Sequence, residues 1–297
     1  NDMSWTLSVV SAGSEYDLSD NVNYLLAGID GIAAAPVARI TERGPMQHGE
    51  SDFGFRLQPR RISLALLDWG GDTAAWFARR EEIMRIFRST NEPIQLRIAW
   101  DNQVRQVDCY LIGMMEMPPA VGLVPGWQKV GIELIAPDPT FYDPVGVTVT
   151  FALGGGGTLS VPLSVPMQVG SSVIDQSIPI YYTGTWDAFP IITARGPITD
   201  LLVQNNSLGD KLDFTGTTIA AGDQYIIDCR YGRKMVTRQS DGANRVQDLS
   251  ADSNLATFRI GAHPNPPGGI NSIRVKASGL TSGSCIYIQF NSRYVGV

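Results

Sequence analysis

Short runs of Val, Ile, Leu and Thr, each closed by glycine or proline, follow one another along most of this sequence. Runs of this kind form β-strands, and the turn formers between them end each strand early. The 31 glycines and 18 prolines of the chain suit many short strands joined by turns better than long helices. The sequence therefore predicts a mainly β protein.

One segment departs from this pattern, between about Asp72 and Arg88. Its apolar side chains recur at helical spacing and predict a helix that covers a sheet with one apolar stripe. Asp72 or Thr73 can cap this helix, and residues 91–93 end it. A stripe of this composition is far more often core than a cofactor site. The residues of the expected stripe are Trp76, Phe77, Ile83, Met84 and Phe87.

A proline-rich junction divides the chain. Three of the eight residues from Pro137 to Pro144 are prolines, which stop strand pairing and stiffen the backbone. A length of 297 residues is comfortable for two domains. We therefore expect one domain over residues 1–140 and a second over residues 141–297. The second is built only of short strands, as in a β-sandwich or jelly roll.

Composition excludes several classes of protein. A net charge of −6 argues against tight binding of nucleic acid, because phosphate contacts need clustered Lys and Arg. No run approaches the roughly 18 apolar residues of a membrane-spanning helix, and the first residues do not open a signal peptide. Cys109, Cys229 and Cys285 form no metal-binding pair, so we expect small buried thiols and folding in a cytosol.

Residue patterns of catalytic sites are absent from the sequence. Neither His48 nor His263 has a neighbouring His, Cys or carboxylate at metal-ligand spacing, and no nucleophile elbow accompanies them. Asp138 and Asp143 are separated like an acid/base pair, but each precedes a proline in the connector, where turn formation explains it. We therefore expect no enzymatic activity, no catalytic residue, no metal and no cofactor.

Two loops are candidate contacts with other subunits. Residues 43–59 are polar and glycine-rich, as in a long loop or hairpin tip. Residues 114–126 are apolar but interrupted by three prolines, so they cannot form a central strand. Such a loop packs either against another subunit or over its own core. The candidate contact residues are His48, Phe53, Met115, Met117, Val121 and Leu123.

A sugar-binding surface is a second candidate site. Tyr182 and Trp186 can offer aromatic faces to pyranose rings, with Asp187 as a polar partner. More often, side chains in such a pattern fill the core of the sandwich or its corner. A carbohydrate-binding β-sandwich protein is therefore the alternative to a protein that assembles with other subunits.

Strand-and-turn segments in both halves of the chain, taken in order, resemble those of the distal tail protein (Dit) family of siphophages. Each segment alone has low specificity, so the order carries the resemblance, which covers most of the chain. One turn departs from the family, since Asn206-Ser207-Leu208-Gly209 stands where the family usually has Asn-x-Thr-Gly. The matching segments are Gly49 with Gly54, then 60–64, 91–96, 136–144, 154–157, 187–197, 221–228, 267–273 and 293–297.

The resemblance implies an N-terminal domain with a helix on a split β-barrel, which assembles as a hexameric ring that continues the tail tube. It implies a galectin-like, jelly-roll sandwich as the C-terminal domain. The implied partners are the tail tube protein, the tape-measure protein and a tail-associated lysin or fibre protein. Assembly would take place in the host cytoplasm, and the product would lie at the tail tip of the virion, away from any membrane.

A ring has two consequences for this sequence. It closes through a heterologous interface, in which one patch meets a different patch on the neighbour, so residues 43–59 and 114–126 are natural contacts. DNA would pass through its lumen without specific binding, for which the acidic balance of the chain is suited.

Overall fold

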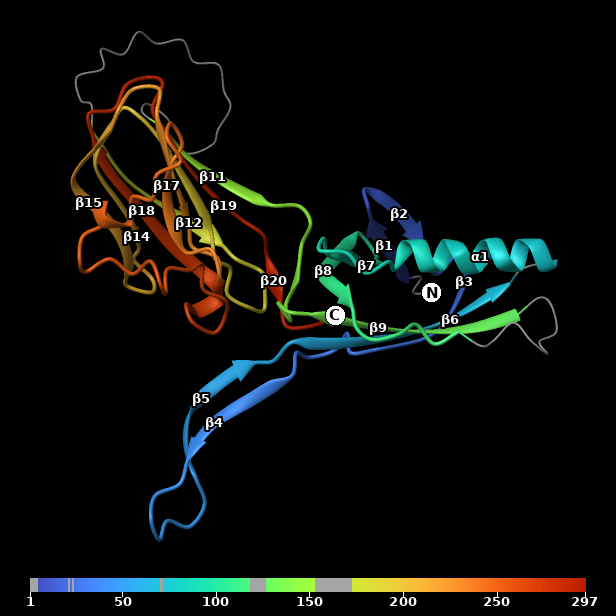
Figure 1. Ribbon diagram of the computed structural model, residues 1–297. Coiled ribbons are helices and arrows are strands. Elements are labelled where there is room, and N and C mark those ends of the chain that lie inside the picture. Colours follow the sequence, from blue (N-terminus) through green and yellow to red (C-terminus); the bar gives the residue numbers. More distant parts are fainter. Residues whose placement is uncertain (1–4, 21, 23, 70–71, 118–126, 153–172) are drawn as a thin grey trace. The chain divides into compact units, whose positions relative to one another are not determined.

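The computed structural model describes residues 5–20, 22, 24–69, 72–117, 127–152 and 173–297, and it is mainly β, as predicted. The chain forms two compact units (Figure 1). Unit 1 comprises Asn1–Pro144 and Tyr294–Val297, and unit 2 comprises Val145–Arg293. The boundary expected from sequence lies four residues before the end of the first segment of unit 1, and it places the last four residues of the chain in the other domain.

Unit 1 is built on a curled antiparallel sheet with the order β2-β1-β7-β8-β9-β6-β3. Alternate side chains of its strands point inward, as Ile94, Leu96 and Ile98 do on β7. β10 (Phe141–Tyr142) pairs with β8 and with β20 (Arg293–Tyr294). The strands of the main path are β1 (Trp5–Ser11), β2 (Ser14–Asp17), β3 (Tyr24–Asp30), β6 (Arg60–Trp69), β7 (Ile94–Trp100), β8 (Gln103–Leu111) and β9 (Trp127–Ala136).

Helix α1 (Thr73–Ile86) lies over this sheet, and the Asp72 carboxylate caps it by accepting a hydrogen bond from the Ala75 N–H at 2.8 Å. The predicted apolar stripe was wrong in two of its members. Trp76, Ile83 and Phe87 are buried, as are the sheet residues around them. The two side chains that instead face outward are those of Phe77, 48% exposed, and Met84, 41% exposed.

The geometry of a helix explains this correction. Each residue turns the helix by about 100°, so two residues seven apart lie on nearly the same side. Trp76 and Ile83 form one such pair and define the buried side. Phe77 and Met84 form the next pair, about 100° further round the helix, where the sheet does not reach.

The end of the chain closes unit 1. The Ala35 N–H donates to the carbonyl of Val295 at 3.1 Å, and the Val297 N–H donates to the carbonyl of Ile32 at 3.0 Å. A Cβ on Gly296 would lie 2.3 Å from the carbonyl oxygen of Ala33, so only glycine permits this approach. The segment that follows unit 2 is thus an integral part of unit 1.

A separate two-stranded sheet, which belongs to unit 1, projects from the main sheet between β3 and β6. It consists of β4 (Val37–Glu42) and β5 (Ser51–Leu57), which pair with one another antiparallel (Figure 1). These strands and the turn between them contain most of the polar segment for which the sequence predicts a long loop or hairpin tip.

Unit 2 is a sandwich of a five-stranded sheet, β11-β19-β13-β16-β17, and a four-stranded sheet, β12-β18-β14-β15. Both sheets contribute to a single apolar core that includes Phe151, Val203, Phe214 and Ile288. The strands are β11 (Val147–Ala152), β12 (Ile174–Tyr181), β13 (Ile191–Arg195), β14 (Ile198–Asn205), β15 (Asp210–Ile219), β16 (Gln224–Asp228), β17 (Met235–Arg238), β18 (Ile270–Ser278) and β19 (Cys285–Phe290). Two short 3-10 helices, η1 (Val246–Asp248) and η2 (Pro267–Gly269), lie in its connections.

The three cysteines are free and buried, as the sequence predicts. Burial raises the pKa of the Cys109 and Cys229 thiols to about 12. None of the helices formed by the described residues is long and apolar enough to cross a membrane.

Candidate functional site

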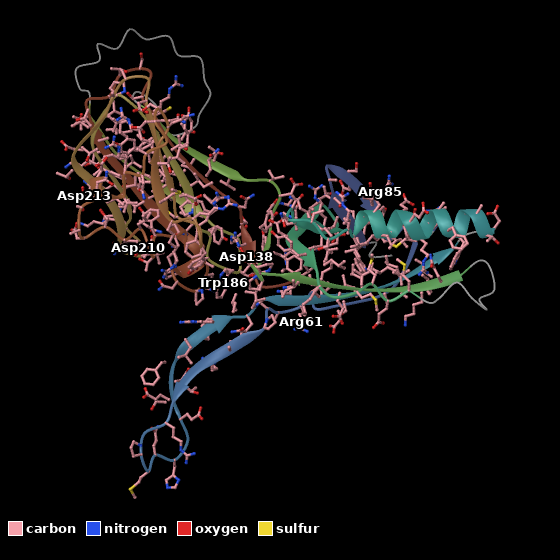
Figure 2. The ribbon with its side chains drawn as sticks, in the orientation of Figure 1. Arg61, Arg85, Asp138, Trp186, Asp210 and Asp213 are labelled. Atoms are coloured by element: carbon pink, nitrogen blue, oxygen red, sulfur yellow. The ribbon has the colours of Figure 1, made fainter. Side chains whose placement is uncertain are left out.

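The β4–β5 hairpin exposes both of its faces. Every residue from Pro36 to Pro59 is exposed or half-exposed, and none is buried. Its side chains project on both sides of the two strands (Figure 2). An isolated two-stranded hairpin is marginally stable in water, because it has no core of its own. The hairpin is therefore a surface that another molecule can cover.

Large apolar side chains are concentrated on this hairpin. Phe53 is 65% exposed, and Met46, in the turn, is fully exposed. Met46 also has a φ of 61°, a backbone conformation that a residue with a Cβ adopts only at a cost. The further apolar side chains that the hairpin exposes are those of Val37, Ile40 and Phe55.

Polar contacts hold the shape of the hairpin. Arg39 pairs with Asp52 across the two strands at 2.8 Å, and its guanidinium lies over the ring of Phe55 at 5.7 Å. In the turn, the backbone N–H of Gly44 donates to the side-chain oxygen of Gln47, and the backbone N–H of Gln47 donates to the carbonyl of Gly44. The hairpin thus has an ordered conformation without burying any residue.

A methionine-lined groove of about 760 Å³ lies elsewhere on unit 1, between α1 and β9. Met84 comes from the exposed side of α1, and Met114 is 84% exposed. The segment that carries Met114 is pinned beside β9, since Glu116 and Gly131 exchange two backbone hydrogen bonds of 2.8 and 2.9 Å. The residues that line the groove are Arg80, Met84, Met114, Met115, Glu116, Met117, Lys129 and Gly131.

The chemistry of this groove suits binding of apolar side chains. Methionine is flexible and polarisable, so a methionine surface adapts its shape to a partner and contacts aromatic rings favourably. Arg80 and Lys129 give the groove a positive rim, against the single carboxylate of Glu116. We name these eight lining residues the methionine groove.

Four of the six subunit-contact residues proposed from sequence lie on these two surfaces. His48 and Phe53 belong to the hairpin, and Met115 and Met117 line the methionine groove. Val121 and Leu123 lie outside the described residues, as do the four glycines from Gly154. The sequence did not predict that Met84 lines a surface groove, because its helical spacing places it within the apolar stripe that was expected to be buried.

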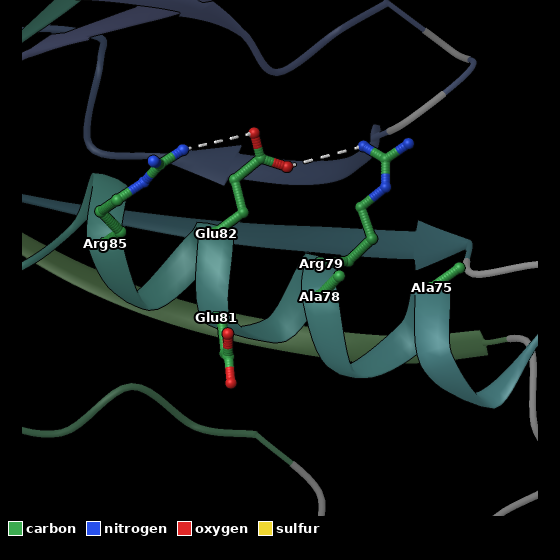
Figure 3. A pocket seen from close by; sticks show the side chains of 6 residues that line it. All are labelled: Ala75, Ala78, Arg79, Glu81, Glu82 and Arg85. Atoms are coloured by element: carbon green, nitrogen blue, oxygen red, sulfur yellow. Dashed lines mark ion pairs between the residues drawn. The ribbon is translucent and has the colours of Figure 1, made fainter.

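The outer face of α1 beside Ala75 and Ala78 is charged rather than apolar (Figure 3). Glu82 lies between Arg79 and Arg85, at 3.8 and 3.9 Å. Glu82 also accepts a hydrogen bond from the Tyr24 hydroxyl at 2.8 Å, and burial together with this carboxylate raises the pKa of Tyr24. Arg79 and Glu82 are half-buried, and their ion pairs are satisfied within the chain, so this face offers no apolar surface to a partner.

The sugar-binding residues proposed from sequence make internal contacts in unit 2. The Tyr182 ring is buried, and its hydroxyl donates to the carbonyl of Trp186 at 2.6 Å and accepts from the Arg293 N–H at 2.7 Å. Asp187 accepts from the Ala262 N–H at 2.8 Å and pairs with Arg259 at 2.9 Å. The predicted role of Tyr182 therefore needs correction, since packing leaves neither face of its ring open to a sugar. Trp186 is half-exposed.

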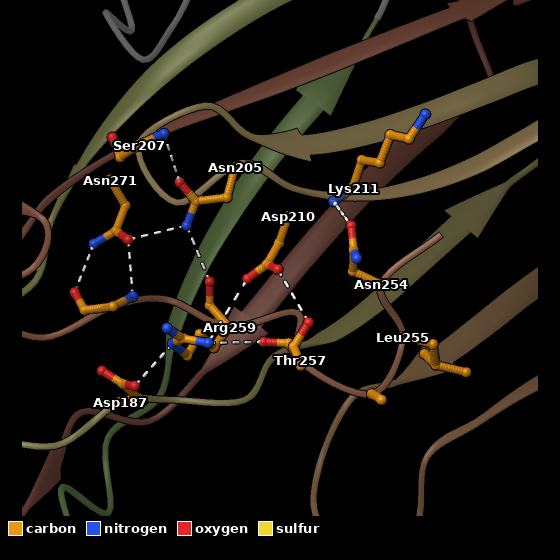
Figure 4. Close-up of polar contacts among 12 residues, drawn as sticks. Asp187, Asn205, Ser207, Asp210, Lys211, Asn254, Leu255, Thr257, Arg259 and Asn271 are labelled. Atoms are coloured by element: carbon orange, nitrogen blue, oxygen red, sulfur yellow. Dashed lines mark hydrogen bonds and ion pairs between the residues drawn. The ribbon is translucent and has the colours of Figure 1, made fainter. Parts of the chain in front are cut away.

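A buried amide network supports this corner of unit 2 (Figure 4). Asn271 accepts hydrogen bonds from Asn205 at 3.0 Å and from the Gly261 N–H at 2.8 Å, and it donates to the carbonyls of Gly261 and Gly269. Both donors and both acceptors of its amide are thus used. Sequence reasoning missed Asn271, although its place in alternation with the apolar Ile273 and Val275 was a signal that it faces inward.

A polar hollow of about 330 Å³ lies beside β15 and β17. Arg238 pairs with Asp223, and the Tyr225 hydroxyl donates to Asp248 at 2.8 Å. Burial alone would raise the pKa of Asp223, but its hydrogen bonds with Arg238, Gln224 and Ser240 lower it. The Nε of Arg245 is buried on the wall of the hollow without a hydrogen-bond partner in the described part of the chain.

Among the described residues, no three His, Cys, Asp or Glu side chains lie together in a group that could hold a metal ion. The geometry supports binding surfaces: two apolar ones on unit 1 and a polar one on unit 2.

Comparison with known proteins gives a fold. No protein-family model and no curated protein matches the sequence. The chain is similar in structure to the SPP1 Dit (gp 19.1) protein, a hub protein of the adsorption apparatus in phages that infect Gram-positive hosts. The identity is 14%, the match covers 98% of this chain and 99% of that chain, and the TM-score is 0.62. A chain of the phage P2 baseplate, in its activated conformation with Ca, matches at 10% identity over 97% and 98% of the two chains, with a TM-score of 0.49.

Proposed function

We propose that this chain is a structural protein of a phage tail tip, whose unit 1 assembles with copies of itself into a ring. The ring connects the tail tube to the tip or baseplate and to the receptor-binding apparatus. The observation that carries this proposal is the apolar surface of unit 1, where the hairpin and the methionine groove expose side chains that a monomer has no reason to expose. The fold shared with the SPP1 Dit protein supports the same function.

The arrangement of exposed surface fits assembly better than catalysis. A ring needs two different patches on each copy, and unit 1 has two, of different shape. The hairpin is convex and the groove is concave. We propose six copies in the ring and no enzymatic activity, with DNA passing through the lumen without specific binding.

Unit 2 has its own apolar core, and we assign to it the contacts with other tail components. In this proposal the partners are the tail tube protein, the tape-measure protein and a tail-associated lysin or fibre protein. The protein would assemble in the host cytoplasm and be located at the tail tip of the virion.

Sedimentation velocity and negative-stain microscopy of the purified full chain test the proposal. We expect a concentration-dependent, closed assembly with six-fold views. A single monomeric species at the highest attainable concentration would contradict it.

Carbohydrate binding by unit 2 is the second candidate, and the polar hollow favours it. Arg238, Arg245 and Asp248 place donors and acceptors around a space of about 330 Å³, which suits a hydroxyl-rich ligand. A glycan array probed with the wild type, Arg245→Ala and Trp186→Ala tests this function and separates the hollow from the site proposed from sequence. Blank arrays for all three proteins would rule this candidate out.

A further inference from the structure

We propose that the β4–β5 hairpin of one copy docks into the methionine groove of the next copy. The two surfaces would then be the two halves of one heterologous contact, repeated around the assembly. This inference rests on the self-assembly proposed above and specifies which surface meets which.

The hairpin needs an apolar partner. Phe53 and Met46 are exposed by 65% and 100%, and no residue of the hairpin is buried in its own chain. Aromatic side chains are typical anchors of protein interfaces, and they bind best in a pocket that excludes water. The methionine groove is an open depression that a docked side chain would cover, and its sulfur atoms suit aromatic rings.

The strand register separates the two surfaces along β6 and β9. The hairpin joins the sheet at Arg60, which pairs with Ala136. The groove lies on the same pair of strands at Gly131, whose partner on β6 is Ala65. Five residues at about 3.3 Å each put roughly 17 Å between these points, and the hairpin leads away from the sheet. The hairpin of a chain is thus remote from its own groove, as a contact between copies requires.

Charge supports the same pairing. The tip of the hairpin, residues 44–53, contains Glu50 and Asp52 and no Lys or Arg. Asp52 already pairs with Arg39, whereas Glu50 makes no ion pair within the described ranges. Lys129, on the rim of the groove, is exposed. A tip that docks into the groove brings the carboxylate of Glu50 towards this ammonium group.

A mixing experiment with two variants of the full chain tests the contact. The hairpin variant carries Phe53→Ser and Phe55→Ser, and the groove variant carries Met84→Glu and Met114→Glu. All four side chains are at least 40% exposed, so the monomers should fold normally. Each variant alone should associate about a hundredfold more weakly than the wild type.

The mixture gives the decisive result. The hairpin variant retains an intact groove and the groove variant an intact hairpin, so one productive contact remains between them. We expect a 1:1 dimer that grows no further, measured by sedimentation velocity. Tyr181→Ser, which removes an aromatic side chain of 73% exposure from unit 2, serves as the matched control and should assemble as the wild type does.

Three outcomes would overturn the inference while leaving self-assembly intact. The two variants stay monomeric when mixed, which indicates that the surfaces do not meet. Or the groove variant alone assembles normally, as it would if other residues of its own chain covered the groove. Or the hairpin variant alone assembles normally. A wild type that never assembles would instead remove the proposed function itself.

A disulfide experiment locates the contact independently. The native cysteines are buried, so Phe53→Cys and Met114→Cys in one chain introduce the only readily accessible thiols of the described residues. Oxidation should give a ladder of covalently linked copies on a denaturing gel, and its largest closed species gives the number of copies. The pair Tyr181→Cys and Met114→Cys should give no ladder. A ladder from this control, or none from the test pair, would contradict the docking.

Discussion

The guanidinium of Arg60 donates a hydrogen bond to the backbone carbonyl of Val295, 235 residues further along the chain. Arg60 is 1% exposed, and it also donates to the carbonyls of Pro139, Gly31 and Ala33. One buried cation thus joins four segments of unit 1, including the segment that returns after unit 2. The planar fork of arginine is suited to this task because its donors point in several fixed directions.

Removal of Tyr294–Val297 should destabilise unit 1 by about 3 kcal/mol. The deletion removes the hydrogen bonds of Val295 and Val297, each of which contributes about 1 kcal/mol, and leaves Arg60 with an unmet donor. Hydrogen exchange measured by mass spectrometry reports each unit separately. We expect faster exchange of the β6 and β8 amides and unchanged exchange in the core of unit 2. Equal protection of β6 in both proteins would contradict the role of the C-terminal segment.

Arg60→Lys should be nearly as damaging to unit 1 as Arg60→Met. A lysine ammonium cannot reach four carbonyls that point at a guanidinium fork, so both variants leave buried acceptors unpaired, at a cost of about 3 kcal/mol. Arg61→Lys, at an exposed neighbouring position, is the matched control and should have little effect. Chemical denaturation measures the difference. Full stability of Arg60→Lys would show that charge alone, and not the fork, is needed.

Much of this fold can be predicted from local sequence patterns. Alternation such as that of Ile94, Leu96 and Ile98 predicts a strand and its inward face, and turn formers predict its end. The role of Arg60 could not be predicted from such patterns. Its partners are backbone carbonyl groups, which every residue type has, and they come from segments far apart in sequence. For the same reason the return of Val295 to unit 1 was beyond any local pattern.

The candidate site was predictable only in part. Residues 43–59 have the composition of a loop or hairpin tip, but composition does not tell whether a hairpin folds back on its core. Met84 shows the opposite difficulty, since its spacing fits the core and only the width of the contact between α1 and the sheet decides that it is exposed. Whether a helix face is exposed depends on how the helix packs in the folded unit, and the sequence of the helix alone does not determine that packing.

Ile83→Ala and Met84→Ala form a matched pair at adjacent residues of α1, one on its buried side and one on its exposed side. Ile83 is fully buried, and its truncation should cost about 3 kcal/mol of stability through the cavity that it leaves. Met84 is 41% exposed, so its truncation should change stability by at most about 0.5 kcal/mol. Assembly should respond in the opposite order, with Met84→Ala weakening self-association while the monomer stays intact. Thermal unfolding and sedimentation together measure both; a strongly destabilised Met84→Ala would indicate a core position.

Asn271→Asp should destabilise unit 2 by about 3 kcal/mol despite its nearly identical shape. The amide donates to the carbonyls of Gly261 and Gly269, and a carboxylate cannot, so two buried acceptors lose their donor and a charge is buried. Asn206→Asp, one residue beyond β14 and exposed, is the control and should be neutral within about 0.5 kcal/mol. Urea denaturation followed by hydrogen exchange in β14 and β18 measures the loss. Equal stability of the two variants would show that the network contributes nothing.

Asp223 should make the stability of unit 2 depend on pH on the acid side. Its hydrogen bonds with Arg238, Gln224 and Ser240 lower the pKa of this carboxyl in the folded protein. A lowered pKa means that the folded state favours the ionised form, so the contribution is fully present above the unfolded pKa of about 3.9. It is lost as the pH falls below that value and through the lower pKa of the folded state. Asp223→Asn should therefore lower the stability of unit 2 at neutral pH and flatten the decline in stability below about pH 4. The control is Asp241→Asn, which changes an exposed carboxylate 3.6 Å from Arg238 and should keep the wild-type profile. The melting temperature of each protein, measured from pH 7 to about pH 3, checks this, and parallel profiles for wild type and Asp223→Asn would contradict it.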